Sequence, residues 1–230
     1  MPTLLPSQEV SLSLSAQVFE RLRSDIIDCR LQPDARLRLE ELRERYGAGA
    51  SPIREALMRL EVEGLVVLEQ NRGFRVSPIS RAHLVDLSAN RIEIEGLALG
   101  WAIERGGVDW EAEVIGAFHR LSRQDKTAPA QAGRIGEAWK KEHRAFHRAL
   151  VSGSGSPILI ATCEALFDQG ERYVALSIAR RAPPRDDVAE HKRIMEAVLA
   201  RDAAAAIAAN REHIERTTEK VLTSIEALAA

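Results

Sequence analysis

Two histidines lie four residues apart in a stretch that has the apolar spacing of a helix. His143 and His147 share a stripe with Trp139, Phe146 and Leu150, so both imidazoles should lie on one inward face. Imidazoles at this spacing on one helix can chelate a single divalent ion. The alternative is a pair of hydrogen-bonded core histidines, and the spacing by itself leaves both interpretations open.

Two further histidines have the same inward character. His191 shares a helix face with Ile194 and Val198, and His213 lies beside Asn210 in the last helical stretch. Four inward histidines on three helices can converge in the core of a bundle, where metal and cofactor sites are usually found. Taken singly, each of them is better explained as a hydrogen-bonded core or surface histidine.

Arg91 lies on an apolar stripe, and a guanidinium there needs an anion. One candidate is Glu95, which is four residues later on the same helix. The other is a carboxylate of a bound effector, held by a bidentate clamp. Arg172 and Tyr173 could line the same pocket.

The elements that would position these residues fall into two groups. After a flexible tail over 1–14, the chain shows helical spacing over 16–30 and 39–46, and a further helix from Ser51 to about Gly64. In that helix Ser51 is predicted as the N-cap and Pro52 as the first helical residue. Two short β-like runs around residues 70–73 then predict a hairpin. Beyond residue 78 the pattern is helical over about 80–105, 109–125, 134–152, 157–179, 184–200 and 202–227, with a polar loop at 126–133.

This order predicts a mainly α protein with two domains. Three helices followed by a hairpin are typical of a winged helix-turn-helix, which we assign to residues 15–78. An all-α antiparallel helical bundle is assigned to residues 79–230. The apolar face of the third helix leaves Ser51 and Arg54 pointing outward together, where they could contact DNA phosphates and base edges. The plain alternative is an amphipathic helix with a solvated arginine.

The bulk composition is that of an ordinary globular protein and points to no partner. The chain has 230 residues, 45% of them hydrophobic and 29% charged, and a formal net charge of −2. Any DNA-binding surface must therefore come from local placement of arginine. No apolar run is long enough to span a bilayer, and the N-terminus lacks the features of a secretion signal. Two cysteines far apart in sequence agree with a reduced, cytoplasmic protein.

The N-terminal motifs resemble those of the GntR family of bacterial regulators. They run from Tyr46 to Leu57 (YGAGASPIREAL), from Leu60 to Leu65 (LEVEGL) and from Asn71 to Val76 (NRGFRV). The resemblance implies a winged helix-turn-helix that binds a double-stranded DNA operator. Many members carry a base-reading arginine where this chain has Ala50, so its operator should differ. The implied DNA-binding residues are Arg38, Ser51, Arg54, Asn71, Arg72 and Gly73.

The C-terminal half resembles the FadR branch of the same family, whose FCD-type helical domain often holds a divalent metal with three histidines and one acidic residue. His147, His191 and His213 match the histidine positions, and His143 stands at the acidic one. Four neutral imidazoles leave the charge at +2, which favours Zn²⁺, or Ni²⁺ as an alternative, over Mg²⁺ or Ca²⁺ and should attract anions. Similar regulators also have an arginine at Arg91. The resemblance thus supports an effector pocket, to which we assign Arg91, Arg172, Tyr173 and Asn210.

Together these observations predict a homodimeric transcriptional repressor controlled by a small carboxylate, with no catalytic residues. Two alternatives remain open at this stage. The first is a regulator that senses the metal itself. The second is a metal-dependent enzyme, which a closed four-histidine site disfavours because catalytic zinc usually keeps one coordination position for water.

Overall fold

The computed structural model describes residues 13–126, 135–179 and 187–226. It divides into two compact units. One comprises the chain up to Ile26 together with Arg30–Pro78, and the other comprises Ile27–Cys29 and the chain from Ile79 onward. The predicted tail lies almost wholly outside the described residues, as does most of the loop expected at 126–133.

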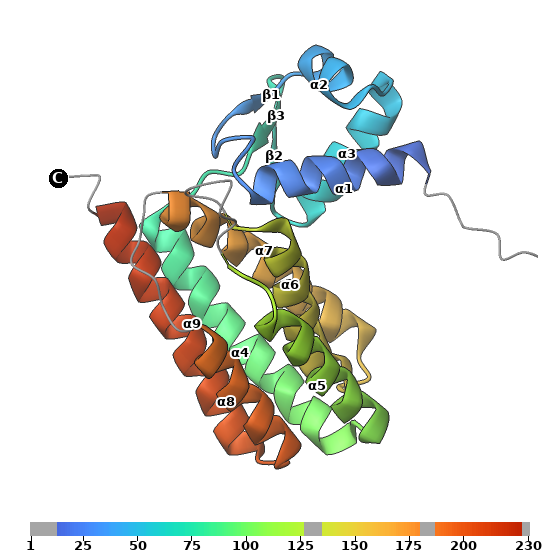
Figure 1. Cartoon of the computed structure of the whole chain (residues 1–230). Coiled ribbons are helices and arrows are strands. Elements are labelled where there is room, and N and C mark those ends of the chain that lie inside the picture. The colour runs from blue at the N-terminus through green and yellow to red at the C-terminus, as the bar shows by residue number, and fades with distance from the viewer. Residues whose placement is uncertain (1–12, 127–134, 180–186, 227–230) are drawn as a thin grey trace, which may run out of the picture. The chain divides into compact units, whose positions relative to one another are not determined.

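The N-terminal unit has the helices and hairpin that the sequence predicts (Figure 1). One feature was missed, because β1 pairs with β3 and so extends the hairpin to a three-stranded antiparallel sheet of order β1-β3-β2. A strand of two residues is too short to show the alternation by which strands are recognised. The elements are α1 (Leu14–Ile27), β1 (Arg36–Leu37), α2 (Leu39–Tyr46), α3 (Ala50–Val62), β2 (Val66–Glu69) and β3 (Gly73–Val76).

The turn between α2 and α3 sets the position of the recognition helix. As expected, α2 ends at Gly47, which adopts a left-handed conformation with φ of 63°. The prediction that Ser51 caps α3 is wrong, because α3 begins at Ala50 and Gly49 occupies the cap position without a side-chain bond. Alanine extends the helix readily, and Pro52 is tolerated in the first turn because the N–H groups there have no partner within the helix.

The buried face of α3 explains which of its side chains point outward. Ile53, Leu57 and Leu60 are completely buried, and they share the core of this unit with Leu22 and Ile26 of α1, which are also completely buried. The helical period then forces the residues between them toward solvent.

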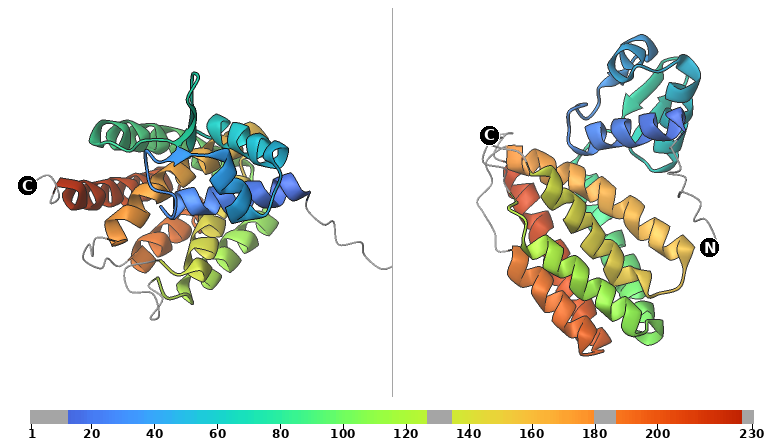
Figure 2. Two further views of the ribbon diagram at one scale, coloured as in Figure 1. Left: turned by 90° about the horizontal axis from the view of Figure 1, so that it is seen from above. Right: turned by 45° about the vertical axis from the view of Figure 1, so that its right-hand side comes forward.

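The C-terminal unit is a bundle in which α4 to α9 run alongside one another, as the further views in Figure 2 show. Helix α4 packs against α6, α7 and α9, and α9 also packs against α7 and α8. These contacts bring α6, α8 and α9, the three helices that carry the inward histidines, into one bundle. The helices are α4 (Arg81–Arg105), α5 (Val108–Ser122), α6 (Glu137–Ser152), α7 (Pro157–Ala179), α8 (Asp187–Leu199) and α9 (Ala203–Glu226).

The main apolar core of this unit holds these three helices in place. Phe146 on α6 and Ile194 on α8 are completely buried in it, together with Ala206 on α9. Phe146 directly precedes His147, and Ile194 lies one turn after His191. The same packing that stabilises the bundle therefore fixes the backbone from which the histidines project.

Candidate metal centre and DNA-binding surface

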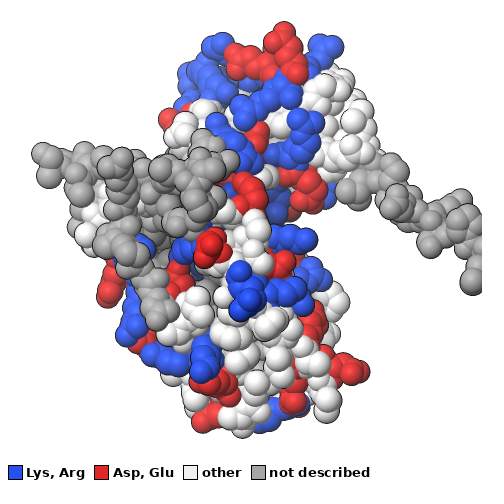
Figure 3. All heavy atoms as spheres, viewed as in Figure 1, with Lys and Arg blue, Asp and Glu red and all other residues white. Residues whose placement is uncertain are grey.

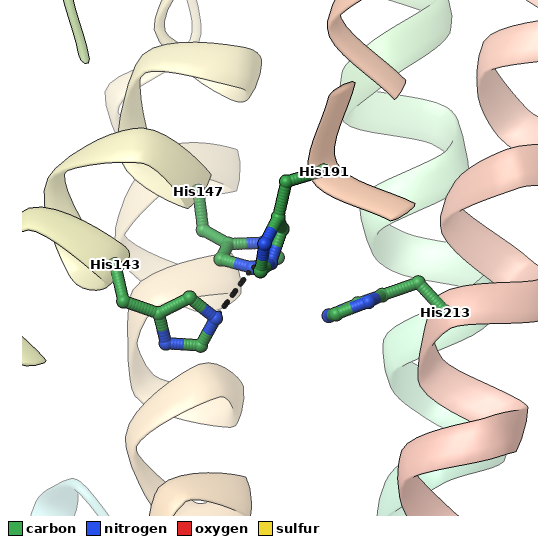
Figure 4. A group of neighbouring side chains, drawn as sticks. All are labelled: His143, His147, His191 and His213. Carbon is green, nitrogen blue, oxygen red and sulfur yellow. Dashed lines mark hydrogen bonds between the residues drawn. The ribbon is translucent and has the colours of Figure 1, made fainter. Parts of the chain in front are cut away.

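The four predicted histidines meet inside the bundle. His143 and His147 come from α6, His191 from α8 and His213 from α9, and one ring nitrogen of each lies within 4.8 Å of the corresponding atom of the others. Figure 4 shows the four rings directed toward one another. All are buried, with exposed fractions from 1% to 8%.

The spacing of these nitrogens fits a tetrahedral ion. The Nε2 atom of His147 lies 3.1 Å from Nε2 of His143 and 3.3 Å from Nε2 of His191. A zinc–nitrogen bond of about 2.0–2.1 Å requires ligand nitrogens roughly 3.3 Å apart. One imidazole nitrogen cannot hydrogen-bond to two such neighbours at once with its single proton or lone pair. A cation at the centre would satisfy all of them, so the residues present fit a metal.

Electrostatics keeps three of these rings in the form that binds metal. Burial lowers the pKa of His143, His147 and His191 well below the ordinary value of 6.5, and neighbouring positive groups such as His213 lower it further. The three imidazoles are therefore neutral at pH 7, with lone pairs available to an ion.

Two carboxylates that sequence reasoning missed lie just outside the histidines. Glu190 Oε2 is 2.9 Å from Nδ1 of His213, and Glu171 Oε2 is 3.6 Å from Nδ1 of His143. Burial raises the pKa of Glu171. The expectation that a metal here would leave an uncompensated +2 charge needs correction, because two carboxylates lie next to the histidine rings, behind the atoms that would bind the ion. Only the position of Glu190 directly before His191 could have hinted at it.

A cavity adjoins the centre. It contains about 400 Å³ of space that no atom fills, part of it open to solvent, and its wall includes His143, His213, Arg91, Glu171 and Phe167. The sequence-based placement of Arg91 near the histidines is therefore consistent with the geometry. This cavity is where a small molecule could meet both an ion at the histidines and a guanidinium.

Arg91 makes the ion pair that was one of its two predicted alternatives. Its Nε donates to Oε1 of Glu95 at 2.7 Å, and Asn210 on α9 donates to the other carboxylate oxygen at 3.2 Å. Gly170 leaves room for the guanidinium, because a Cβ there would lie 2.7 Å from Nη1 of Arg91. Within the described part of the chain, Nη1 and Nη2 have no hydrogen-bond acceptor, so the guanidinium keeps a free edge. Asn210 is engaged by Glu95.

Tyr173 and Arg172 lie elsewhere than predicted. The hydroxyl of Tyr173 is 2.7 Å from Nδ1 of His83 and donates to the carbonyl of Ser80 at 3.3 Å, both at the start of α4. Arg172 is 1% exposed, and burial lowers its pKa. Neither residue is among the described residues that line the cavity beside the histidines.

The predicted DNA contacts lie on the surface of the N-terminal unit. Ser51 and Arg54 are exposed on α3, and Arg72 is exposed at the tip of the hairpin. Asn71 and Gly73 have φ of 60° and 82°, so they shape the tip that presents Arg72.

Charge on this unit is mixed. Arg38 is exposed just before α2 and pairs with Glu41 at 3.1 Å. On the face shown in Figure 3, basic and acidic side chains are interspersed and form no single basic surface. On this face the candidate DNA contacts are therefore individual arginines rather than one basic patch.

An exposed helix of a helix-turn-helix with a wing, followed in the chain by a helical bundle, is typical of bacterial transcriptional regulators. The comparisons with known proteins agree. Residues 14–76 match the model of the bacterial regulatory proteins of the gntR family, and residues 86–216 match the FCD domain. The chain belongs to the GntR family, in the group with an FCD domain, and is a DNA-binding transcriptional regulator rather than an enzyme.

Named relatives cover nearly the same span. The HTH-type transcriptional regulator BphR of Paraburkholderia xenovorans is 36% identical over 91% of this chain and 85% of its own length. The HTH-type transcriptional repressor GlaR of Escherichia coli is 36% identical over 84% of this chain and 89% of its own. Among solved structures, E. coli McbR/YncC shares the fold with a TM-score of 0.73 at 24% identity, covering 93% of this chain and 99% of its own.

No helix in the described residues combines the length and apolar character needed to cross a membrane.

Proposed function

We propose that this regulator is a homodimeric repressor whose operator binding is controlled by a small carboxylate bound beside a divalent metal. The observation that carries the proposal is the shared cavity, whose wall contains two of the four clustered histidines and the guanidinium of Arg91. The metal would be held by His143, His147, His191 and His213. Zn²⁺ is favoured, with Ni²⁺ as the alternative, because all four donors are imidazole nitrogens.

The chemistry of the cavity favours an acid. When bound, the ion supplies a positive centre that can accept a carboxylate oxygen as a further ligand. The Nε of Arg91 donates its hydrogen bond to Glu95, and the Nη1–Nη2 edge of the guanidinium can bind a carboxylate in bidentate fashion. Glu95 and Asn210 orient that edge, so Asn210 acts on the effector through Glu95.

The DNA-binding side of the proposal follows from the exposed residues of the N-terminal unit. Arg54 reads base edges in the major groove, Ser51 contacts phosphate, and Arg72 reaches phosphate or the minor groove. Arg38 adds a backbone contact once it leaves Glu41. A second copy of the chain is required because one recognition helix covers only one half-site. Operator binding places this action in the cytoplasm.

Calorimetry with a panel of mono- and dicarboxylates on metal-loaded protein tests the effector site. We expect at least one binder whose affinity falls about tenfold or more in Arg91→Ala, since a charged hydrogen bond contributes about 1.5–3 kcal/mol. Arg211→Ala is the control, because Arg211 is exposed on α9 and pairs with Glu93 away from this cavity. Equal affinity in Arg91→Ala and wild type would refute the pocket.

The alternative of direct metal sensing has a separate readout. Fluorescence anisotropy on an operator selected from genomic DNA measures DNA affinity with metal and carboxylate added separately. A change produced by metal alone, with no further change on adding any carboxylate, would make the ion the effector. Sedimentation of a monomer in the presence of the operator would refute the dimer.

A further inference from the structure

We infer that Glu171 on α7 and Glu190 on α8 complete the histidine centre as positioning residues. Glu171 would accept a hydrogen bond from the outward N–H group of His143, and Glu190 one from that of His213. The inference rests on the proposed metal site and deepens it. Neither carboxylate is a metal ligand. Each determines which nitrogen of its histidine partner faces the ion.

The hydrogen bond between Glu190 and His213 is already formed. Its Oε2 lies 2.9 Å from Nδ1 of His213, and the two residues are each 7% exposed. A proton on Nδ1, shared with a carboxylate, leaves the lone pair on Nε2. In Figure 4 the tip of the His213 ring points toward the other histidines, so this lone pair faces the centre. Glu190 therefore holds His213 in the tautomer that binds metal.

The corresponding hydrogen bond between Glu171 and His143 is not yet formed. His143 has its Nε2 directed inward, 3.1 Å from Nε2 of His147. Its Nδ1 is buried and has no hydrogen-bond partner in the described residues, although Glu171 Oε2 is 3.6 Å away. Glu171 likewise makes no hydrogen bond within the described part of the chain. The buried Nδ1 of His143 and the partly buried carboxylate of Glu171 thus lie a few tenths of an ångström beyond hydrogen-bonding distance.

A bound ion would favour a shorter distance between Nδ1 of His143 and the carboxylate of Glu171. Coordination through Nε2 requires the proton of His143 to be on Nδ1, where Glu171 is the nearest carboxylate. The positive ion makes that N–H a stronger donor and attracts the carboxylate. Because Glu171 lines the cavity, space beside its side chain is available for this short movement. Four neutral imidazoles bring no negative ligand, and the two carboxylates supply negative charge directly behind them.

Affinity for Zn²⁺ alone, measured by competition with a chromophoric chelator, tests the inference without an effector. Loss of an outer-shell partner typically weakens metal binding about 10–100-fold, so we expect this loss in Glu171→Gln and in Glu190→Gln. Glu164→Gln is the matched control, because Glu164 lies on the same helix as Glu171 but pairs with Arg148. It should bind Zn²⁺ within about threefold of wild type.

A second measurement needs no variant and so does not depend on variant folding. Histidine ¹⁵N spectra of the zinc-loaded wild-type protein should show protonated Nδ1 on His143 and His213. A zinc-bound Nδ1 on either ring would overturn the inference, as would variants that keep wild-type affinity or a control that weakens equally. If the wild-type chain binds no divalent metal, the proposed metal site itself fails, which is a distinct result.

Discussion

Replacing Glu95 should destabilise the helical unit strongly, because it leaves Arg91 buried without its anion. The side chains of Arg91 and Glu95 are only 10% and 7% exposed, and their contact is 2.7 Å. Breaking a buried ion pair by removing one partner costs about 3–5 kcal/mol. Arg91 borders the cavity and can recover some solvation there, so we expect Glu95→Gln to cost about 3 kcal/mol, at the lower end of this range.

Urea denaturation of metal-free protein, followed by circular dichroism, measures this cost through a double-mutant cycle. Arg91→Met should also destabilise, because it leaves the Glu95 carboxylate with only Asn210. The double variant Arg91→Met/Glu95→Gln should lose much less than the sum of the single changes, since no unpaired charge remains. Additive losses, or a cost below about 1 kcal/mol for Glu95→Gln, would show that solvent already screens this pair.

Four shorter predictions concern DNA, metal, pH and signalling. Arg54→Ala should weaken operator binding by about 1–3 kcal/mol in anisotropy at fixed salt, with unchanged helicity, because Arg54 is exposed. Chelation should lower the melting temperature in calorimetry, because a ligand present at 1,000 times its Kd stabilises by about 4 kcal/mol. Because burial lowers the pKa of His147 and His191 in the fold, the unfolded chain takes up protons first as pH falls through their ordinary value of 6.5. Metal-free protein should therefore lose stability below that pH in urea titrations, and a flat profile would contradict these shifts. Tyr173→Phe should keep zinc and carboxylate affinity in calorimetry but reduce the effect of carboxylate on operator affinity.

The sequence predicted the helices well because their apolar periods are long and regular. The four histidines could be found for the same reason, since each lies on the stripe that packing must bury. The contacts between helices could not be found in this way. Glu171 and Glu190 lie next to the histidines because α6, α7, α8 and α9 pack together. The apolar period of a helix does not predict which other helices are its neighbours.

Local errors have equally local causes. Ser51 has the residue type of an N-cap, but the preceding Ala50 already adopts helical geometry and moves the cap to Gly49. Tyr173 was predicted to line the effector pocket. Its hydroxyl instead bonds to Ser80 and His83, a contact that depends on how α7 lies against α4.

That misplaced tyrosine suggests how a ligand in the cavity would act at the boundary between the two units. The cavity has Arg91 of α4 in one wall and Phe167 and Glu171 of α7 in another. Helix α4 begins at Arg81, three residues after the N-terminal unit ends at Pro78. Tyr173 on α7 binds Ser80 in the same short stretch. Both walls are thus connected to the chain immediately after the boundary, and we expect a ligand that changes their spacing to alter the Tyr173–Ser80 hydrogen bond. Coupling of this kind requires only a difference in ligand affinity between the two arrangements. Because Tyr173 is not among the described residues that line the cavity, we expect removal of its hydroxyl to separate signalling from binding.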